Sequence, residues 1–371
     1  MMNAINPGIL CFPSLLLEQT DRYSENFSLP DFLYDGEGRL DRAATRTLML
    51  SEEYGFVRDE GISVTVETLK ERNKNLFADK CRLYRHLSFR LARDEAEAAF
   101  PVDLYLPTNG TGDTVVALDF SMTPERVYCP IEELMERGLT VARVQYDTVT
   151  SDDGDFANGI APLLVPDRTA RSAAGKLAIW AYAANLVGNY LLKEGYATRG
   201  SLYVSGHSRL GKTALLTAAI YEQFDGAHVN NSGCSGFAIS REKDGETIEK
   251  ICKVFPYWFA PTYCEYANRE NEAPFDQHYL AALVAPRLLS VVTAEKDAWA
   301  DTEAQYLCAE AASVIYEKYG VKGLDESAGM LTTPGRSTAG QIAFCMRKGT
   351  HFFSRDDWHF FADVLESKRK R

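Results

Sequence analysis

The octet at residues 206–213, GHSRLGKT, carries the most informative chemical pattern in the chain. As G-x-x-x-x-G-K-[ST] it is a complete match to a phosphate-binding loop, ending in Lys212 and Thr213. It also follows a strand-like run, SLYVS, and opens a helical segment, as a phosphate-binding loop should. This first interpretation predicts a nucleotide-binding protein.

The same octet fits a nucleophile elbow, the strand-to-helix turn that presents a catalytic serine. Gly206 lies two residues before Ser208, where a side chain would clash with the crowded backbone of the turn. The usual second glycine, two residues after the serine, is Leu210 here, and Gly211 follows one place later. This second interpretation predicts a serine hydrolase.

The order of the surrounding segments favours the elbow. A phosphate loop normally sits on an early strand and precedes an acidic strand, whereas here the run VVALD, which ends at Asp119, comes before the octet. A serine hydrolase needs a carboxylate and then a histidine, each after a later strand. Asp297 follows LLSVVTAEK and His351 follows IAFCMRKGT. We therefore expect Ser208 to be the nucleophile and His351 the base that takes its proton.

His351 is preferred among the histidines because it lies in a loop just before the last predicted helix. Ser354 can cap that helix, with Asp357 three residues on, and His359 would lie inside it. The other histidines come earlier in the chain. The six candidates are His86, His207, His228, His278, His351 and His359.

Three acidic residues follow the strand-like run LLSVVT and could orient the base: Glu295, Asp297 and Asp301. Asp301 sits where it could cap the next helix, which is a structural role. Asp297 lies nearer the end of the strand. We expect Asp297 to be the acid of the triad.

A tetrahedral intermediate needs hydrogen-bond donors aimed at its oxyanion. The backbone N–H of Arg209 is the expected first donor, and the loop near Ser121 could supply a second. The Arg209 side chain has two interpretations, a charged donor to the oxyanion or a structural ion pair.

Strand-like and helical segments alternate from Cys81 onward, which predicts an α/β fold with a mainly parallel sheet covered on both faces. Residues 1–78 look irregular, and we expect an N-terminal extension packed on a main domain at 79–371. Strands are predicted over 84–91, 102–106, 115–120, 140–146, 201–205, 288–293 and 342–346. Helices are predicted over 173–192, 212–224, 301–319 and 355–365.

The composition indicates which classes of partner the protein can bind. The 371 residues carry a net charge of −12 and a pI of about 5.1, which argues against nucleic acid and anionic membranes. The eight cysteines show no metal-ligand spacing and are expected to be buried free thiols. We expect no metal and no cofactor. The N-terminus lacks a basic region and Pro13 interrupts its apolar run, so a cytoplasmic location is expected unless a leader has been removed.

These motifs together resemble a known family. The run GHSRLGKTAL is similar to the elbow of the glucuronoyl esterases, carbohydrate esterase family 15, especially its bacterial members. The resemblance covers roughly residues 99–366 and continues through NSGCSGFAISREKDGETIEKI, FPYWF, PFDQHYLAALVAPR, AEKDAWAD and KGTHFFSRDDW. It implies an α/β-hydrolase fold and hydrolysis of the ester between a glucuronic acid of xylan and an alcohol.

The resemblance also implies roles for individual residues. Ser208 and His351 match the nucleophile and the base, and Arg209 matches an arginine that helps to hold the oxyanion. Lys212 and Glu246 match positions that bind sugar hydroxyls, and Trp299 matches an aromatic residue beside the uronate; each of these three also has a purely structural interpretation.

The family places its acid at one of two positions. One is a glutamate before the SGxxG stretch, which corresponds to Asn231 here, and the other corresponds to Asp297. Because an asparagine cannot serve as the acid, the resemblance assigns that role to Asp297.

The sequence thus predicts a serine ester hydrolase that acts through an acyl-enzyme on a small carbohydrate ester, above all a glucuronoyl ester. An acetyl esterase is the nearest alternative, because the same groups can remove acetyl esters. A nucleotide-binding protein and a catalytically inactive carbohydrate-binding homologue are alternatives of other classes.

Overall fold

The computed structural model describes residues 7–73, 76–120, 129–325 and 335–370. These residues contain a ten-stranded sheet with the order β1-β2-β3-β5-β4-β6-β7-β8-β10-β9. The strands are β1 (Ser63–Arg72), β2 (Cys81–Arg93), β3 (Ala96–Pro107), β4 (Thr114–Asp119), β5 (Thr140–Gln145), β6 (Leu202–His207), β7 (Gly226–Asn230), β8 (Leu288–Ala294), β9 (Gly335–Ser337) and β10 (Ile342–Arg347).

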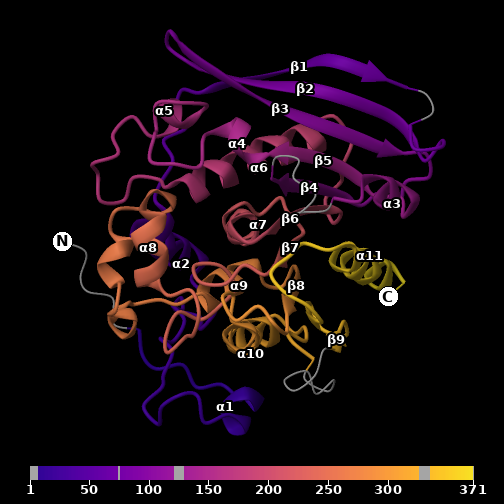
Figure 1. Ribbon diagram of the computed structural model, residues 1–371. Coiled ribbons are helices and arrows are strands. Elements are labelled where there is room, and N and C mark those ends of the chain that lie inside the picture. Colours follow the sequence, from indigo (N-terminus) through magenta and orange to yellow (C-terminus); the bar gives the residue numbers. More distant parts are fainter. Residues whose placement is uncertain (1–6, 74–75, 121–128, 326–334, 371) are drawn as a thin grey trace.

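The middle of the sheet is parallel, from β5 through β4, β6, β7 and β8 to β10. Antiparallel strands extend it at both edges: β1, β2 and β3 at one, and β9 at the other. In Figure 1 the long antiparallel strands cross the top of the molecule above the parallel strands. The predicted α/β class and mainly parallel sheet are therefore confirmed.

Helices lie on both faces of the sheet (Figure 1), and β4 shows why. Val115 and Ala117 belong to a smaller apolar core that includes residues of α3 and α11, whereas Val116 and Leu118 belong to a larger core that includes residues of α6, α7, α9 and α10. Successive strand residues face opposite sides of a sheet, so an uninterrupted apolar strand requires cover on both. The helices are α1 (Leu15–Gln19), α2 (Arg42–Met49), α3 (Ile131–Glu136), α4 (Tyr146–Val149), α5 (Ala161–Leu164), α6 (Lys176–Lys193), α7 (Arg209–Ile220), α8 (Ile248–Val254), α9 (His278–Val284), α10 (Thr302–Lys318) and α11 (Arg355–Arg369).

The seven predicted strands and four predicted helices are all confirmed, with ends that shift by a few residues. The expectation that residues 1–78 are irregular is wrong, because they include α2 and the ten-residue strand β1. Strand β1, SVTVETLKER, is exposed along nearly its whole length, and of its residues only Val66 is partly buried against the core, so its apolar alternation is limited to Val64 and Val66. The short central strand β7, GAHVN, was also missed.

The expectation of free thiols holds for only part of the cysteines. Cys252 and Cys264 form a disulfide that links α8 to the short 3-10 helix Tyr263–Tyr266, which corrects the prediction for these two residues. The other cysteines are free, and Cys11 is exposed rather than buried. No helix in the described ranges is both long and apolar enough to cross a membrane.

A buried carboxyl group joins the N-terminal part of the chain to the rest. Glu53 lies in a short π-helix (Leu50–Tyr54), and its two oxygens accept hydrogen bonds from Gln277 Nε2 at 2.8 and 3.1 Å. Its backbone carbonyl accepts the N–H of Ala260 at 2.8 Å. Burial raises the pKa of Glu53 to about 8, because the charged form would lose its water.

This raised pKa predicts a pH dependence of stability. Between the ordinary carboxyl pKa and about 8, the folded protein holds a proton that the unfolded chain has released, so Glu53 makes stability fall as pH rises. Glu53→Gln should remove this loss, gaining roughly 3–4 kcal/mol over the native protein between pH 5 and pH 8. Urea unfolding of the native protein and of Glu53→Gln at several pH values measures this difference in unfolding free energy. A difference that does not change with pH would contradict the assignment.

Candidate active site

Ser208 stands in a strained turn between β6 and α7. Its φ of 55° and ψ of −124° are rarely adopted by residues with side chains, and its N–H donates to the carbonyl of Asn230 at 2.9 Å. A Cβ on Gly206 would lie 2.1 Å from the Leu210 carbonyl oxygen, and one on Gly211 would lie 3.0 Å from the Asn230 oxygen. Both glycines are therefore required by close backbone contacts, the second one place later than in the usual motif.

Asp297 and His351 lie together although 54 residues separate them. Asp297 Oδ2 is 2.6 Å from His351 Nδ1, and Asp297 Oδ1 accepts the N–H of Ala300 at 3.2 Å. The Asp297 side chain is 2% exposed and the His351 side chain is 37% exposed. A carboxylate on Nδ1 favours the tautomer whose Nε2 can accept a proton.

The His351 ring lies beside the elbow, because its centroid is 4.6 Å from that of His207, the residue before Ser208. His207 Nδ1 is 2.5 Å from Asn230 Oδ1. Burial, followed by the charge of His351, lowers the pKa of His207 well below its ordinary value. His207 is therefore a neutral neighbour that packs against the candidate base.

The other histidines have partners elsewhere in the fold. His86 contacts Asp103, His228 contacts Ser290, His278 contacts the Pro30 carbonyl and His359 contacts Glu133. His359 lies in α11, whose start shows the predicted capping box of Ser354 and Asp357.

Asp301 has the predicted capping role, since its Oδ1 accepts the N–H of Ala304 at 3.1 Å. It also makes a two-point contact with the Arg22 guanidinium, and Lys243 Nζ lies 3.6 Å away. Burial alone would raise the pKa of Asp301, but Arg22 and Lys243 hold it below its ordinary value. Through Arg22 and its cap on α10, Asp301 links the N-terminal segment to that helix.

Asn231, at the alternative position for the acid, is buried at the end of β7. Its Nδ2 donates to the Phe352 carbonyl at 3.5 Å, so it reaches the loop that carries His351. Glu295 is exposed, and its N–H donates to the Arg347 carbonyl. Of the three acidic residues after β8, Asp297 is the one in contact with a histidine.

The Arg209 guanidinium is held by an ion pair. Nη1 contacts Asp152 Oδ2, and the guanidinium carbon lies 4.7 Å from the Trp258 ring centroid and 5.2 Å from that of Phe255. The sequence analysis missed Asp152, because the run SDDGD resembles an ordinary solvated loop. Ser121, the suggested source of a second oxyanion donor, lies outside the described residues.

Lys212 and Glu246 form a buried pair. Lys212 Nζ donates to the carbonyls of Ser232 and Cys234 at 2.6 Å each and to Glu246 Oε2 at 2.7 Å. The Lys212 side chain is 3% exposed, and its three protons all have acceptors. Glu246 Oε1 accepts the indole N–H of Trp299 at 3.2 Å. Lys212 is therefore placed to hold Glu246, and the half-exposed Trp299 extends this cluster to the surface.

These contacts disfavour a phosphate-binding loop. The lysine of such a loop must reach phosphates and its threonine a metal ion. Here the Lys212 ammonium is buried on protein acceptors, and the Thr213 hydroxyl donates to the Arg209 carbonyl at 3.0 Å. Across the described ranges, no group of three or more His, Cys, Asp or Glu is arranged to hold a metal ion.

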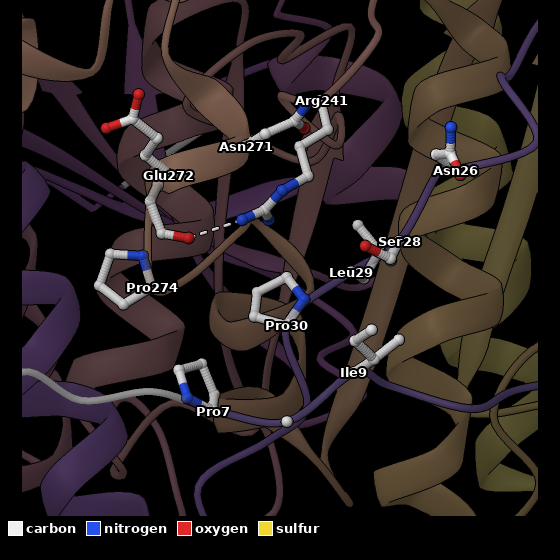
Figure 2. Close-up of a pocket in the computed structure, with 12 residues that line it drawn as sticks. Pro7, Ile9, Asn26, Ser28, Leu29, Pro30, Arg241, Asn271, Glu272 and Pro274 are labelled. Carbon is white, nitrogen blue, oxygen red and sulfur yellow. Dashed lines mark hydrogen bonds between the residues drawn. The ribbon is translucent and has the colours of Figure 1, made fainter.

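A separate cavity of about 330 Å³ lies between the N-terminal segment and residues 271–274 (Figure 2). The Arg241 guanidinium at its edge donates to the Ala273 carbonyl at 2.6 Å and to Asp276 at 3.2 Å. Ser208, Asp297 and His351 do not line it. This cavity is therefore not the candidate active site.

Comparison with known proteins identifies the family of the chain. A family model described as "Glucuronyl esterase, fungi" matches residues 92–320, more than half of the chain. The chain belongs to the glucuronyl esterase family. A carbohydrate esterase, MZ0003, from an unknown prokaryotic organism is 34% identical over 239 residues, which cover 64% of this chain and 55% of that protein.

Two further relatives agree with this family. A 4-O-methyl-glucuronoyl methylesterase of Podospora anserina is 25% identical over 63% of this chain and 49% of its own length. The solved glucuronoyl esterase from Solibacter usitatus superposes with a TM-score of 0.80 at 26% identity, covering 92% of this chain and 98% of that one. The chain spans about half the length of the curated relatives it matches. The α/β-hydrolase fold implied by the resemblance is confirmed.

The two aspartates after β8 should respond differently to the same substitution. Asp297→Asn should lower kcat by a factor on the order of 10³–10⁴ with little change in stability, because it disturbs the orientation of His351. Asp301→Asn should keep the helix cap but weaken the buried pair with Arg22, costing about 2–4 kcal/mol of stability. Steady-state kinetics and urea unfolding of both variants measure the two effects. The reverse pattern would show that Asp297 is not the acid.

Proposed function

We propose that this protein is a serine ester hydrolase acting on a glucuronoyl ester through an acyl-enzyme. The observation that carries the proposal is the buried Asp297 paired with His351 beside the strained turn at Ser208. This set supplies a nucleophile, a base and the carboxylate that orients the base. The names of the family and of its relatives support the glucuronoyl part of the proposal.

The proposed reaction has two halves. His351 Nε2 takes the proton of the Ser208 hydroxyl as its oxygen attacks the ester carbonyl carbon, and the Arg209 N–H and guanidinium stabilise the oxyanion. The intermediate collapses, the alcohol leaves with the proton from His351, and the uronate stays esterified to Ser208. Water, activated by His351, then attacks this acyl-enzyme and releases the free uronic acid and Ser208.

The helix after the elbow favours this charge development. Arg209 is the first residue of α7, and the N–H groups of a helix's first turn have no partners within the helix. They lie at the positive end of the helix dipole, where a developing oxyanion is stabilised. The guanidinium of the same residue, paired with Asp152, is proposed to add positive charge beside the oxyanion.

The sugar is proposed to meet the cluster of Lys212, Glu246 and Trp299. Glu246 can accept hydrogen bonds from hydroxyls, and the half-exposed indole of Trp299 offers an apolar face to a pyranose ring. Lys212 contributes by holding the carboxylate of Glu246 in place. Lys250 Nζ lies 5.6 Å from the centroid of the Trp299 ring, so one region of this face carries a positive charge.

A hydrolysis panel tests the substrate class. Methyl glucuronate, benzyl glucuronate, acetylated xylose and p-nitrophenyl acetate should be compared at equal concentrations, with Ser208→Ala as the inactive control. We expect the highest kcat/KM on the glucuronate esters. Higher activity on acetylated xylose would establish the alternative, an acetyl esterase. Activity of Ser208→Ala equal to that of the native protein would refute the mechanism.

The sugar-binding cluster gives a second test. Glu246→Ala should lower kcat/KM on benzyl glucuronate by roughly 1–3 kcal/mol of transition-state binding, because hydroxyls of the sugar lose their acceptor. It should barely change activity on p-nitrophenyl acetate, which has no sugar hydroxyls. Glu249→Ala, a nearby acidic residue at the start of α8, is the matched control. Equal losses on the two esters would mean that Glu246 only supports the fold.

The disulfide of Cys252 and Cys264 argues against the cytoplasmic location expected from the sequence. Disulfides persist in oxidising compartments and are rare where thiols are kept reduced. We therefore infer that the protein works in an oxidising compartment. Counting free thiols by mass spectrometry, after alkylation of the protein in its producing cells, should leave these two cysteines unmodified. Alkylation of both cysteines would support a cytoplasmic location.

A further inference from the structure

Asp152 is the centre of a hydrogen-bond network around Arg209. Its Oδ2 accepts from Arg209 Nη1 and, at 2.9 Å, from the Tyr146 hydroxyl, and its Oδ1 accepts from the Trp258 indole N–H at 2.7 Å. The backbone carbonyl of Asp152 accepts from the Tyr257 hydroxyl at 3.0 Å. Its side chain is 11% exposed. A carboxylate this enclosed, with three side-chain donors, has few other conformations.

The loop that carries Asp152 is itself fixed. Asn158 Oδ1 accepts from the Ser151 N–H at 2.7 Å, and Asn158 Nδ2 donates to the Ser151 hydroxyl at 2.6 Å. The buried ammonium of Lys176 donates to the Thr150 hydroxyl at 2.7 Å and to the Asp155 carbonyl at 2.6 Å. These bonds anchor the loop on both sides of Asp152, so its carboxylate is presented from a rigid support.

Aromatic rings enclose the Arg209 guanidinium as well. Its central carbon lies 4.7, 5.2 and 5.7 Å from the ring centroids of Trp258, Phe255 and Phe120. Its Nε is buried and, among the described residues, has no hydrogen-bond partner. The rings limit tilting of the guanidinium plane, and Asp152 fixes its rotation through Nη1. The remaining amino group, Nη2, then has one defined direction.

We propose that Asp152 is a positioning residue that orients the Arg209 guanidinium toward the oxyanion, an inference that rests on the ester hydrolysis proposed above. An unpaired arginine loses rotamer entropy when it meets a transition state, whereas one held by a carboxylate is already oriented. The negative charge of Asp152 also lowers the cost of keeping the guanidinium among aromatic rings. Asp152 therefore stabilises the transition state through Arg209. This stabilisation is the same whichever alcohol or sugar the ester carries.

Asp152→Asn tests the proposal, because it keeps the shape and removes the charge. We expect kcat to fall about 10- to 100-fold with KM changed less than twofold, and to the same extent on benzyl glucuronate and p-nitrophenyl acetate. Asp153→Asn is the control: Asp153 is exposed, and its carboxylate bonds within its own loop to the Ser151 hydroxyl and the Asp155 N–H. It should keep native kcat. Native kcat in Asp152→Asn would overturn the proposal.

A double-mutant cycle separates positioning from a general structural role. If Asp152 acts through Arg209, Asp152→Asn should change kcat less than twofold in an Arg209→Met background. An equal loss in both backgrounds would show that Asp152 acts by another route and would overturn the proposal. Tyr146→Phe removes one donor to Asp152 without changing charge, so it should cause a two- to tenfold loss of kcat that also disappears in the Arg209→Met background. This variant keeps the test decisive if Asp152→Asn fails to fold.

The two proposals can fail separately. If the native protein cleaves p-nitrophenyl acetate but no glucuronate ester, the glucuronoyl function fails while the cycle can still be measured. If it cleaves neither ester, the rate at which paraoxon phosphorylates Ser208, followed by p-nitrophenol release, replaces kcat. Asp152→Asn should slow this phosphorylation at least tenfold, since a similar negative charge develops on oxygen. An unchanged rate would overturn the positioning role.

Discussion

The backbone strain at Ser208 is the constraint on which the candidate site depends. A residue with a side chain at φ 55° and ψ −124° costs about 1–3 kcal/mol and persists only where the surroundings enforce it. Here the parallel neighbours β4 and β7 hold β6, and two glycines let the turn close against Leu210 and Asn230. The same turn follows the carboxyl end of the central strand β6 and starts α7, with Arg209 as its first helical residue.

Buried charge is the second theme, because each charged side chain proposed for the site is paired. Asp297 contacts His351, Asp152 contacts Arg209 and Glu246 contacts Lys212. Breaking a buried pair leaves one charge without water or partner, which costs more than the pair itself contributes. These pairs therefore fix geometry.

The parallel strands and their long helices could be predicted from sequence because apolar runs such as VVALD and LLSVVT are continuous and clearly bounded. The order Ser208, Asp297, His351 could also be predicted, since the loops of a parallel sheet meet at the carboxyl ends of its strands. Other features depend on tertiary contacts that no local pattern contains. The apolar face of β1 is limited to Val64 and Val66, Asp152 looks like part of a solvated loop, and the burial of Lys212 requires acceptors 20 to 34 residues away.

The N-terminal segment also has a consequence for how the chain is made. The Ser14 hydroxyl donates to Glu310 at 2.6 Å, across 296 residues of sequence, and Arg22 pairs with Asp301. At about 5–20 residues per second, a ribosome needs about 15–60 s to produce these partners. During that time Phe32, which is buried in the finished protein, lacks the rings of His278 and Tyr279 that it packs against. The nascent chain therefore passes through a long interval in which its first segment is open to chaperones and to misassociation.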